Sequence, residues 1–309
     1  MKGILLVNMG GANSPKELKN FLARMFNDPF ILPYGKPVRK LLSFIISNTR
    51  KKTSWKKYEL IGGSPIIDAT RLTMLALQNS LGENYSVKRA FSYTSPLIRE
   101  SIESFIREGY KEITVIPLYP QASYTTTSSV EKEVNDIVSK TGSIQIHFIK
   151  EFYQRDQFVC FWSNLISNHI RKYNYTNPFL LFSAHSIPKF LVEKGDSYPQ
   201  AIEASAREIA EKSGIHYEVA YQSGMSRREW LGPEIKDSLI KLAKKKEEQI
   251  VIIPVSFVNE NLETLYDIDH GIIPFAKNDL GIKRISRVEI PVADVHFIEL
   301  LTEIVLEAN

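Results

Sequence analysis

The chain has 309 residues, of which 43% are hydrophobic and 24% charged, and its formal net charge at pH 7 is +4. This composition is typical of a folded globular protein, and the charge is too small to indicate a nucleic-acid partner. No apolar run approaches the ~20 residues of a membrane-spanning helix. The four apolar residues 4–7 near the start are too few for a signal peptide. The single cysteine, Cys160, excludes an internal disulfide and a cysteine-ligated cluster, so we expect a cytoplasmic protein.

Short β-branched runs alternate with longer helical stretches along the chain, a pattern that predicts parallel sheets covered by helices. Strands are predicted near 3–7, 87–91, 112–116, 144–149, 179–182, 217–221, 249–255 and 284–288. The expected fold class is α/β: two doubly wound Rossmann-like lobes, each with a four-stranded parallel sheet, and an active-site cleft between them. The first lobe spans 1–150 and the second 151–309. Residues 294–307 predict a terminal helix, a candidate for packing back on the first lobe.

The first two predicted strands are separated by far more residues than a helical crossover needs, so the first lobe carries an insertion at about 30–58. Apolar residues at 38, 41, 42 and 45 have helical spacing, and the simplest interpretation is a helix buried against its own lobe. The alternative is a hydrophobic lip over the cleft, for an apolar substrate or a membrane surface. Basic residues at 50–57 would add an anion-binding rim, which makes 38–57 a candidate for peripheral membrane contact.

Polar or glycine-rich segments directly follow six of the predicted strands, three in each lobe. They are residues 8–11, 92–96, 119–121, 183–188, 222–225 and 256–263. In open α/β sheets, ligands bind outside the carboxyl ends of the strands. The six segments therefore predict one shared site.

His185 is the first residue in these segments that could carry chemistry. A single histidine is more often a structural residue than a ligand. His185, however, lies at the carboxyl end of a predicted strand beside Ser183 and Ser186, a combination that the other five histidines lack. It is therefore the best candidate for a catalytic or metal-binding histidine.

A second candidate is Glu263, in an acidic segment that follows a buried strand. If this segment is α-helical, Glu263, Asp267 and His270 share one face. Like charges four residues apart destabilise a helix, and no lysine or arginine lies between 246 and 277 to compensate them. The commoner fate of such a run is a solvated surface, but a cation bound at the cleft would also offset the repulsion.

The pair of His185 and Glu263 suits a divalent ion such as Fe²⁺ or Zn²⁺. The same pair also suits proton abstraction, and the spacing leaves both roles open. No P-loop, complete dinucleotide-binding glycine motif or Gly-x-Ser-x-Gly elbow is present, so nucleotide chemistry is unsupported.

Nearly end to end, the chain resembles the ferrochelatase family, enzymes that insert ferrous iron into a porphyrin at the end of haem biosynthesis. The segments that carry the resemblance are 6–11, 61–66, 118–121, 182–188, 195–199, 230–233 and 262–266. Phe-Ser-Ala-His-Ser-Ile-Pro at 182–188 and Leu-Glu-Thr-Leu-Tyr at 262–266 together are highly specific.

The resemblance implies that His185 and Glu263 bind iron and take protons from the pyrrole nitrogens. It implies that Met9 lies against the porphyrin, and a methionine there is typical of enzymes that use protoporphyrin IX. Further porphyrin contacts are implied at pocket-lining residues and at the propionate end: Tyr93, Tyr119 and Trp230, and Arg50, Tyr58 and Ser64 respectively. Porphyrin and Fe²⁺ are then substrates, and no organic cofactor or iron–sulfur cluster is expected.

The chain departs from the eukaryotic pattern of this family at three positions. Asn261 stands where those members often have histidine, Ser92 where they have arginine, and Gly271 where their acidic stripe continues. The route of protons or metal through the remaining carboxylates, Glu260, Asp267 and Asp269, is therefore open. Two rival functions are a chelatase for a more polar tetrapyrrole and a carrier that binds porphyrin without metallating it.

Overall fold

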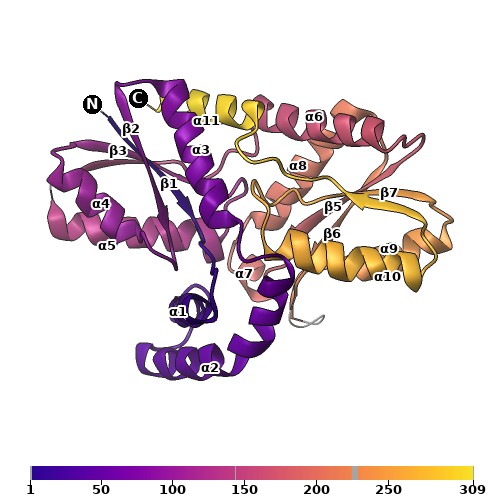
Figure 1. Ribbon diagram of the computed structural model, residues 1–309, viewed down its shortest axis with the longest axis horizontal. Coiled ribbons are helices and arrows are strands. Elements are labelled where there is room, and N and C mark those ends of the chain that lie inside the picture. Colours follow the sequence, from indigo (N-terminus) through magenta and orange to yellow (C-terminus); the bar gives the residue numbers. More distant parts are fainter. Residues whose placement is uncertain (1, 143, 225–228, 309) are drawn as a thin grey trace. The chain divides into compact units, whose positions relative to one another are not determined.

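The computed structural model describes residues 2–142, 144–224 and 229–308 (Figure 1). The chain divides into two compact units. The first comprises Met1–Glu151 with Val292–Asn309, and the second comprises Phe152–Pro291. Each unit contains one four-stranded sheet in which every pairing is parallel. The α/β fold class and the two Rossmann-like sheets are therefore confirmed.

In the first unit the strand order is β2-β1-β3-β4. The strands are β1 (Lys2–Asn8), β2 (Tyr85–Phe91), β3 (Glu112–Pro117) and β4 (Gln145–Phe148). The helices around this sheet are α3 (Ile66–Leu81), α4 (Ile98–Arg107) and α5 (Ser129–Thr141), and a π-helix, η1 (Tyr124–Ser128), leads into α5. Because β1 is central and covered on both sides, its residues from Gly3 to Asn8 are all buried, as is usual for a doubly covered parallel strand.

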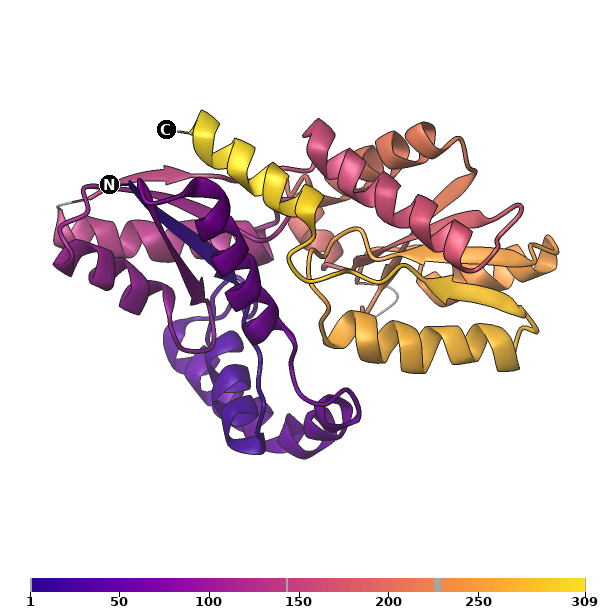
Figure 2. The same ribbon diagram turned by 45° about the horizontal axis from the view of Figure 1, so that its top comes forward.

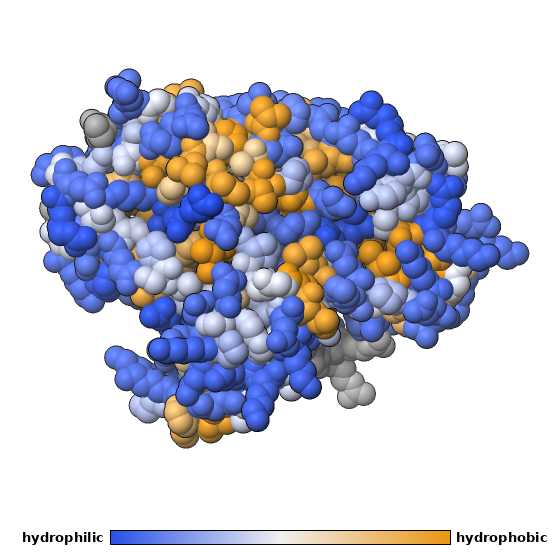
Figure 3. All heavy atoms as spheres, in the orientation of Figure 1, coloured by the Kyte–Doolittle hydropathy of each residue, from blue (hydrophilic) through white to orange (hydrophobic). Residues whose placement is uncertain are grey.

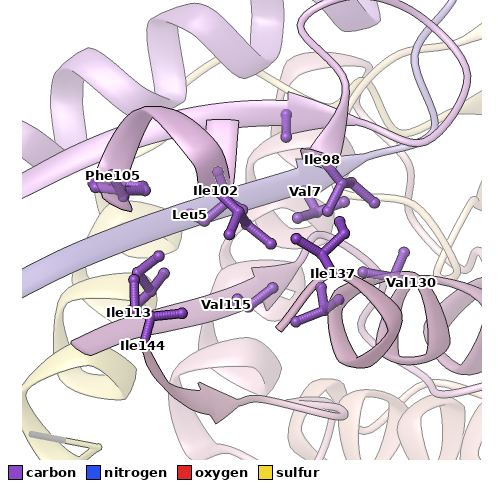
Figure 4. Close-up of a cluster of buried hydrophobic side chains, with 12 residues drawn as sticks. Leu5, Val7, Ile98, Ile102, Phe105, Ile113, Val115, Val130, Ile137 and Ile144 are labelled. Carbon is purple, nitrogen blue, oxygen red and sulfur yellow. The ribbon is translucent and has the colours of Figure 1, made fainter. Parts of the chain in front are cut away.

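One face of the first sheet packs against α4 and α5. Leu5 and Val7, which alternate along β1 and so share a face, meet Ile98 and Ile102 of α4 (Figure 4). Val130 and Ile137 of α5 complete this part of the core. Apolar side chains of α4 and α5 thus pack against those of β1, β2 and β3. This packing fixes the strands whose carboxyl ends carry the polar segments.

The terminal helix α11 (Val295–Glu307) belongs to the first unit. It runs beside α3 in both ribbon views (Figures 1 and 2), and the Ser80 and Thr302 hydroxyls lie 2.9 Å apart across this contact. Asp294 caps the helix by accepting a hydrogen bond from the His296 backbone N–H. Its buried residues include Leu300, Leu301 and Ile304, which supply the apolar surface that holds the helix in place.

The predicted insertion at about 30–58 corresponds largely to one helix, α2 (Lys36–Leu60), which follows α1 (Pro15–Met25). The prediction that the apolar positions 38, 41, 42 and 45 are buried against their own lobe is wrong: Val38 is 50% exposed, Leu41 61% and Ile45 45%. Instead α2 packs on α1 through a small polar residue, because the buried Ser43 hydroxyl donates a hydrogen bond of 2.6 Å to the Ala23 carbonyl. Figure 3 shows apolar atoms (orange) on the surface at the lower edge of the view, where α2 lies in Figure 1.

In the second unit the strand order is β6-β5-β7-β8. The strands are β5 (Phe179–His185), β6 (Tyr217–Gln222), β7 (Gln249–Ile253) and β8 (Arg284–Arg287). The helices are α6 (Asp156–Lys172), α7 (Lys189–Glu193), α8 (Tyr198–Ser213), α9 (Ile235–Lys244), a second π-helix η2 (Glu263–Ile272), and α10 (Ile273–Asn278). A core formed by Leu181, Leu239 and Ile252 also includes Ile268 of η2, so that helix is held against the sheet.

Candidate active site

His185 is the last residue of β5, and its backbone N–H donates a hydrogen bond of 3.3 Å to the Ser256 hydroxyl, beyond the end of β7. Its ring Nδ1 lies 2.7 Å from the Ser186 carbonyl oxygen. A carbonyl can only accept, so Nδ1 carries the proton in the neutral ring and Nε2 carries the lone pair. The side chain is partly exposed, so this lone pair belongs to a group that a ligand can reach.

The neighbouring strand places Gln222 directly opposite His185 in the register. The Gln222 side chain is buried, and its Oε1 accepts a hydrogen bond of 2.9 Å from the Ser183 hydroxyl. Its Nε2 is 3.5 Å from the Glu263 backbone carbonyl oxygen. Gln222 therefore connects the strand of His185 to the helix of Glu263. Sequence reasoning identified the segment but not this residue, although a glutamine at the end of a buried strand was the available signal.

The segment that contains Trp230 pairs with the segment that follows His185. Pro188 and Trp230 form an antiparallel β-bridge, and the Leu231 N–H donates a hydrogen bond of 2.9 Å to the Ile187 carbonyl. The Ser186 hydroxyl donates a further one of 3.0 Å to the Leu231 carbonyl. Two stretches some forty residues apart in the chain are thus joined beside the histidine. Met225, at the end of segment 222–225, lies outside the described residues.

Glu263 is the first residue of η2, which is a π-helix, so the shared face that an α-helix would give Glu263, Asp267 and His270 does not form. Hydrogen bonds between residues five apart make a wider turn, so residues seven apart no longer share a face. His270 is accordingly exposed, and its ring is tilted by 34° against the Tyr266 ring, with centroids 6.0 Å apart. Asp267, in contrast, accepts a hydrogen bond of 2.8 Å from the Ser223 hydroxyl, next to Gln222. The face toward β6 thus includes the Glu263 carbonyl and the Asp267 carboxylate.

The charge compensation that the local sequence lacks comes from β8. The Arg287 guanidinium, whose side chain is 3% exposed, contacts Glu260 Oε1 at 2.8 Å and Asp269 Oδ2 at 2.8 Å. Burial by itself would lower the pKa of Arg287, but its hydrogen bonds with Asp269 and the charge of Glu260 raise it above its ordinary value. This arginine stays charged, and two acidic residues on either side of Glu263 are paired with it.

In the first unit, Met9 and Ser64 lie on two loops that approach closely. Gly10 has a φ of +93°, and a Cβ on it would lie 2.9 Å from the Thr94 side chain. A Cβ on Gly11 would lie 2.0 Å from the Ser64 hydroxyl oxygen, so only glycine allows this contact. Met9 is partly exposed beside this turn, whereas Ser64 is buried in it.

Tyr93 and Tyr119 form a hydroxyl cluster at the carboxyl ends of β2 and β3. The buried Tyr93 donates a hydrogen bond of 2.7 Å to Asp28 Oδ2, and burial together with the Asp28 charge raises the pKa of Tyr93. Burial also raises the pKa of Tyr119, against the effect of its hydrogen bond with Ser92. Ser92 thus forms a hydrogen bond with this tyrosine. Both phenols remain protonated at neutral pH and can donate hydrogen bonds.

The remaining two predicted contacts lie on α2 and differ in exposure. Arg50 is exposed, with its guanidinium 5.9 Å from the centre of the Phe26 ring. Tyr58 is buried, and its backbone carbonyl accepts a hydrogen bond of 2.8 Å from the Gly63 N–H. The first unit therefore gathers Met9, Tyr93 and Tyr119 at strand ends, and presents Arg50 from the insertion.

The α/β fold is similar to that of solved structures of chelatases. SirB of Bacillus subtilis, determined with Fe³⁺, superposes with a TM-score of 0.61 at 12% identity, over 99% of this chain and 95% of that one. CbiX, described as the terminal enzyme of sirohaem biosynthesis in denitrifying bacteria, gives 0.56 at 12% identity, over 99% of both chains. At such low identity these similarities establish the fold.

Sequence similarity identifies the family. The ferrochelatase family model matches residues 1–309. The ferrochelatase of Aquifex aeolicus is 35% identical over 98% of this chain and 98% of its own length, and that of Sulfurihydrogenibium is 32% identical over 99% and 98%. The chain belongs to the ferrochelatase family. It is an enzyme of haem biosynthesis that inserts iron into protoporphyrin, and the rival interpretation as a non-catalytic porphyrin carrier is wrong.

Proposed function

We propose that His185 and Glu263 carry out Fe²⁺ insertion into protoporphyrin IX together, with His185 as the main proton acceptor. The reaction replaces the two protons on pyrrole nitrogens with one Fe²⁺, so both protons must leave. The observation that carries the proposal is the hydrogen bond of His185 Nδ1 with the Ser186 carbonyl, which directs the basic lone pair to Nε2. Glu263, at the start of η2, supplies an oxygen ligand that replaces water on the ion.

Distortion of the macrocycle accompanies the proton transfer in this proposal. A flat porphyrin hides its nitrogen lone pairs in the ring plane, and bending the ring exposes them. Binding energy from the edge of the macrocycle can supply such strain, on the order of 1–5 kcal/mol. Met9, Tyr93, Tyr119 and Trp230 are our candidates for contact with the ring. Arg50 is our candidate for the propionates, because a guanidinium forms paired hydrogen bonds with a carboxylate; Tyr58 and Ser64 remain predictions there.

The catalytic assignment is tested by anaerobic insertion of Fe²⁺, and of Zn²⁺ as an air-stable probe, into protoporphyrin IX. His185→Ala is expected to lower the turnover rate by about 10²-fold or more, the usual effect of losing a general base. Glu263→Gln keeps the shape and removes the charge, and about a tenfold loss or more is expected. His216→Ala is the matched control, because His216 is exposed and precedes β6 at the opposite end of the strand. Near-normal turnover in His185→Ala would overturn the assignment.

We also propose that α2 makes peripheral contact with a membrane that carries anionic lipids. The support is an exposed apolar row, with Val38 50%, Leu41 61% and Phe44 64% exposed, followed along the helix by basic residues at 50, 51, 52, 56 and 57. Apolar side chains enter the headgroup region while lysine and arginine attract anionic headgroups. Among the described residues, no helix has the length and apolar character to cross a bilayer.

The membrane proposal is tested by cosedimentation with vesicles of phosphatidylglycerol and phosphatidylcholine, compared with phosphatidylcholine alone. Leu41→Ser with Phe44→Ser should weaken binding to the anionic vesicles by about tenfold or more, because burial of one such side chain contributes about 1.5–3 kcal/mol. Leu306→Ser is the control, since Leu306 is 58% exposed on α11, away from the basic residues. Equal binding by the double variant would contradict the proposal.

A further inference from the structure

Arg287 is the last residue of β8, and its guanidinium forms four hydrogen bonds. Nη1 is 2.8 Å from Glu260 Oε1 and 3.1 Å from the Val288 carbonyl oxygen. Nε and Nη2 are 3.0 Å and 2.8 Å from the two carboxylate oxygens of Asp269. A planar guanidinium that serves two carboxylates at once is a geometry that lysine cannot reproduce.

The Glu260 carboxylate has further partners besides Arg287. Glu260 Oε1 also accepts a hydrogen bond of 2.8 Å from the Ile290 backbone N–H, and its second oxygen accepts one from the Thr264 hydroxyl. Glu260 is 15% exposed and Asp269 33%. Because these carboxylates precede and follow Glu263 in the chain, Arg287 fastens both ends of the segment that carries it.

The other two acidic residues of this segment have different neighbours. Asp267 contacts the Ser223 hydroxyl, and the Glu263 backbone contacts the Gln222 amide, at the carboxyl end of β6. The four acidic residues are thus divided between two surroundings: a buried arginine for Glu260 and Asp269, and the strand end next to His185 for Glu263 and Asp267.

We propose that Arg287 is a positioning residue of metal insertion, which withdraws Glu260 and Asp269 from metal binding and holds η2 so that Glu263 and Asp267 are its metal-handling acids. The inference rests on the proposed role of Glu263. Its physical basis is that, without the arginine, the unpaired carboxylates of Glu260 and Asp269 would repel their neighbours on η2 and bind the ion away from the porphyrin, which weakens productive metal binding by Glu263 and Asp267. With Glu260 and Asp269 paired to the buried arginine, Glu263 and Asp267 are the two acids of this segment that remain for the ion.

The experiment uses the full-length enzyme with Zn²⁺ and protoporphyrin IX. Arg287→Met is expected to raise the apparent KM for Zn²⁺ by about tenfold, as for loss of a residue that supports a metal ligand. The KM for protoporphyrin should stay within about twofold of the native value, because the proposed role of Arg287 concerns the metal-binding carboxylates and not the porphyrin. Calorimetric titration with Zn²⁺ should show additional binding to the unpaired carboxylates. Lys241→Met, which removes a more exposed ion pair with Glu218, is the matched control. It should change neither the KM for Zn²⁺ nor the amount of Zn²⁺ bound.

A triple variant that neutralises Arg287, Glu260 and Asp269 distinguishes the effect of the unpaired charges from the effect of lost packing. Arg287→Met combined with Glu260→Gln and Asp269→Asn should restore the native KM for Zn²⁺ and remove the additional binding. If Arg287→Met does not fold, this triple variant and Arg287→Lys carry the test, and Arg287→Lys should raise the KM for Zn²⁺. A folded Arg287→Met with native metal kinetics and stoichiometry overturns the proposal, and so does a loss that persists in the triple variant. Glu263→Gln measured in parallel tests the underlying assignment, since native turnover in that variant refutes the role of Glu263 whatever Arg287 does.

Discussion

The Nδ1 atom of His185 lies 2.7 Å from the carbonyl oxygen of Ser186, the next residue in the chain. Because a carbonyl oxygen only accepts hydrogen bonds, the neutral imidazole carries its proton on Nδ1 and its lone pair on Nε2. We therefore predict the Nδ1–H tautomer for neutral His185 in the resting enzyme. Long-range ¹H–¹⁵N correlation spectra of protein labelled at histidine would identify it, and His185→Gln would assign the signals. An Nε2–H tautomer would contradict the geometry.

Gln222 is expected to matter for stability through Ser183. Gln222→Met removes the acceptor of the buried Ser183 hydroxyl, and an unsatisfied buried group costs about 1–3 kcal/mol. Ser183→Ala with Gln222→Met removes donor and acceptor together, so the double variant should lose less free energy of unfolding than the sum of the single variants. Urea unfolding of the four proteins measures this cycle, and strict additivity would mean that the two residues act independently.

His169 should make stability depend on pH. It is 6% exposed, its Nε2 lies 2.7 Å from the Ser286 hydroxyl, and burial lowers its pKa to about 4. The folded state therefore keeps the ring neutral where the unfolded chain, with a pKa near 6.5, takes up a proton. This contribution to stability is complete above pH 6.5 and is lost as the pH falls toward 4. Between pH 6.5 and 5.5 the loss is about 1 kcal/mol.

The measurement is urea unfolding at these two pH values for the native protein and for His169→Gln, whose amide can still bond to Ser286. The variant should show a smaller fall in free energy of unfolding between the two pH values. An equal fall in both proteins would assign the pH dependence to other groups.

Helix α2 should respond to substitution in the opposite sense from an ordinary amphipathic helix. Phe44→Ser changes a side chain that is 64% exposed, so the free energy of unfolding should change by no more than about 0.5 kcal/mol. Ser43→Leu enlarges a buried residue that bonds to Ala23, and overpacking there should cost about 1–3 kcal/mol. Thermal or urea unfolding distinguishes the two. A greater loss from Phe44→Ser would mean that the apolar row packs on the protein.

Some of the structure followed from local sequence pattern alone. All eight predicted strands are present, because β-branched runs bounded by turn residues indicate buried parallel strands wherever they occur. The position of His185 at a strand end and of Glu263 after β7 followed from the same pattern. Their chemical roles came from the family resemblance, because imidazole and carboxylate serve equally well as ligands and as bases.

The differences between prediction and structure concern two helices, α2 and η2, whose conformation or buried face depends on tertiary contacts. Helical spacing in α2 predicted a buried apolar row, but the contact with α1 selected the serine at 43, since a small residue lets two helices approach. For the segment from Glu263, an α-helix would place Glu263, Asp267 and His270 on one face, but the structure contains the wider π-helix, which the sequence pattern did not indicate.

The sequence by itself determined two parallel sheets, the strand-end position of a histidine, and an acidic segment placed after a buried strand. Only the tertiary structure decided which acids share a partner and which tautomer His185 adopts. Arg287 lies eighteen residues beyond Asp269, and Gln222 lies forty-one before Glu263. Contacts over such separations arise when strands align side by side, so the carboxylates of one short segment acquired two different surroundings that no local pattern records.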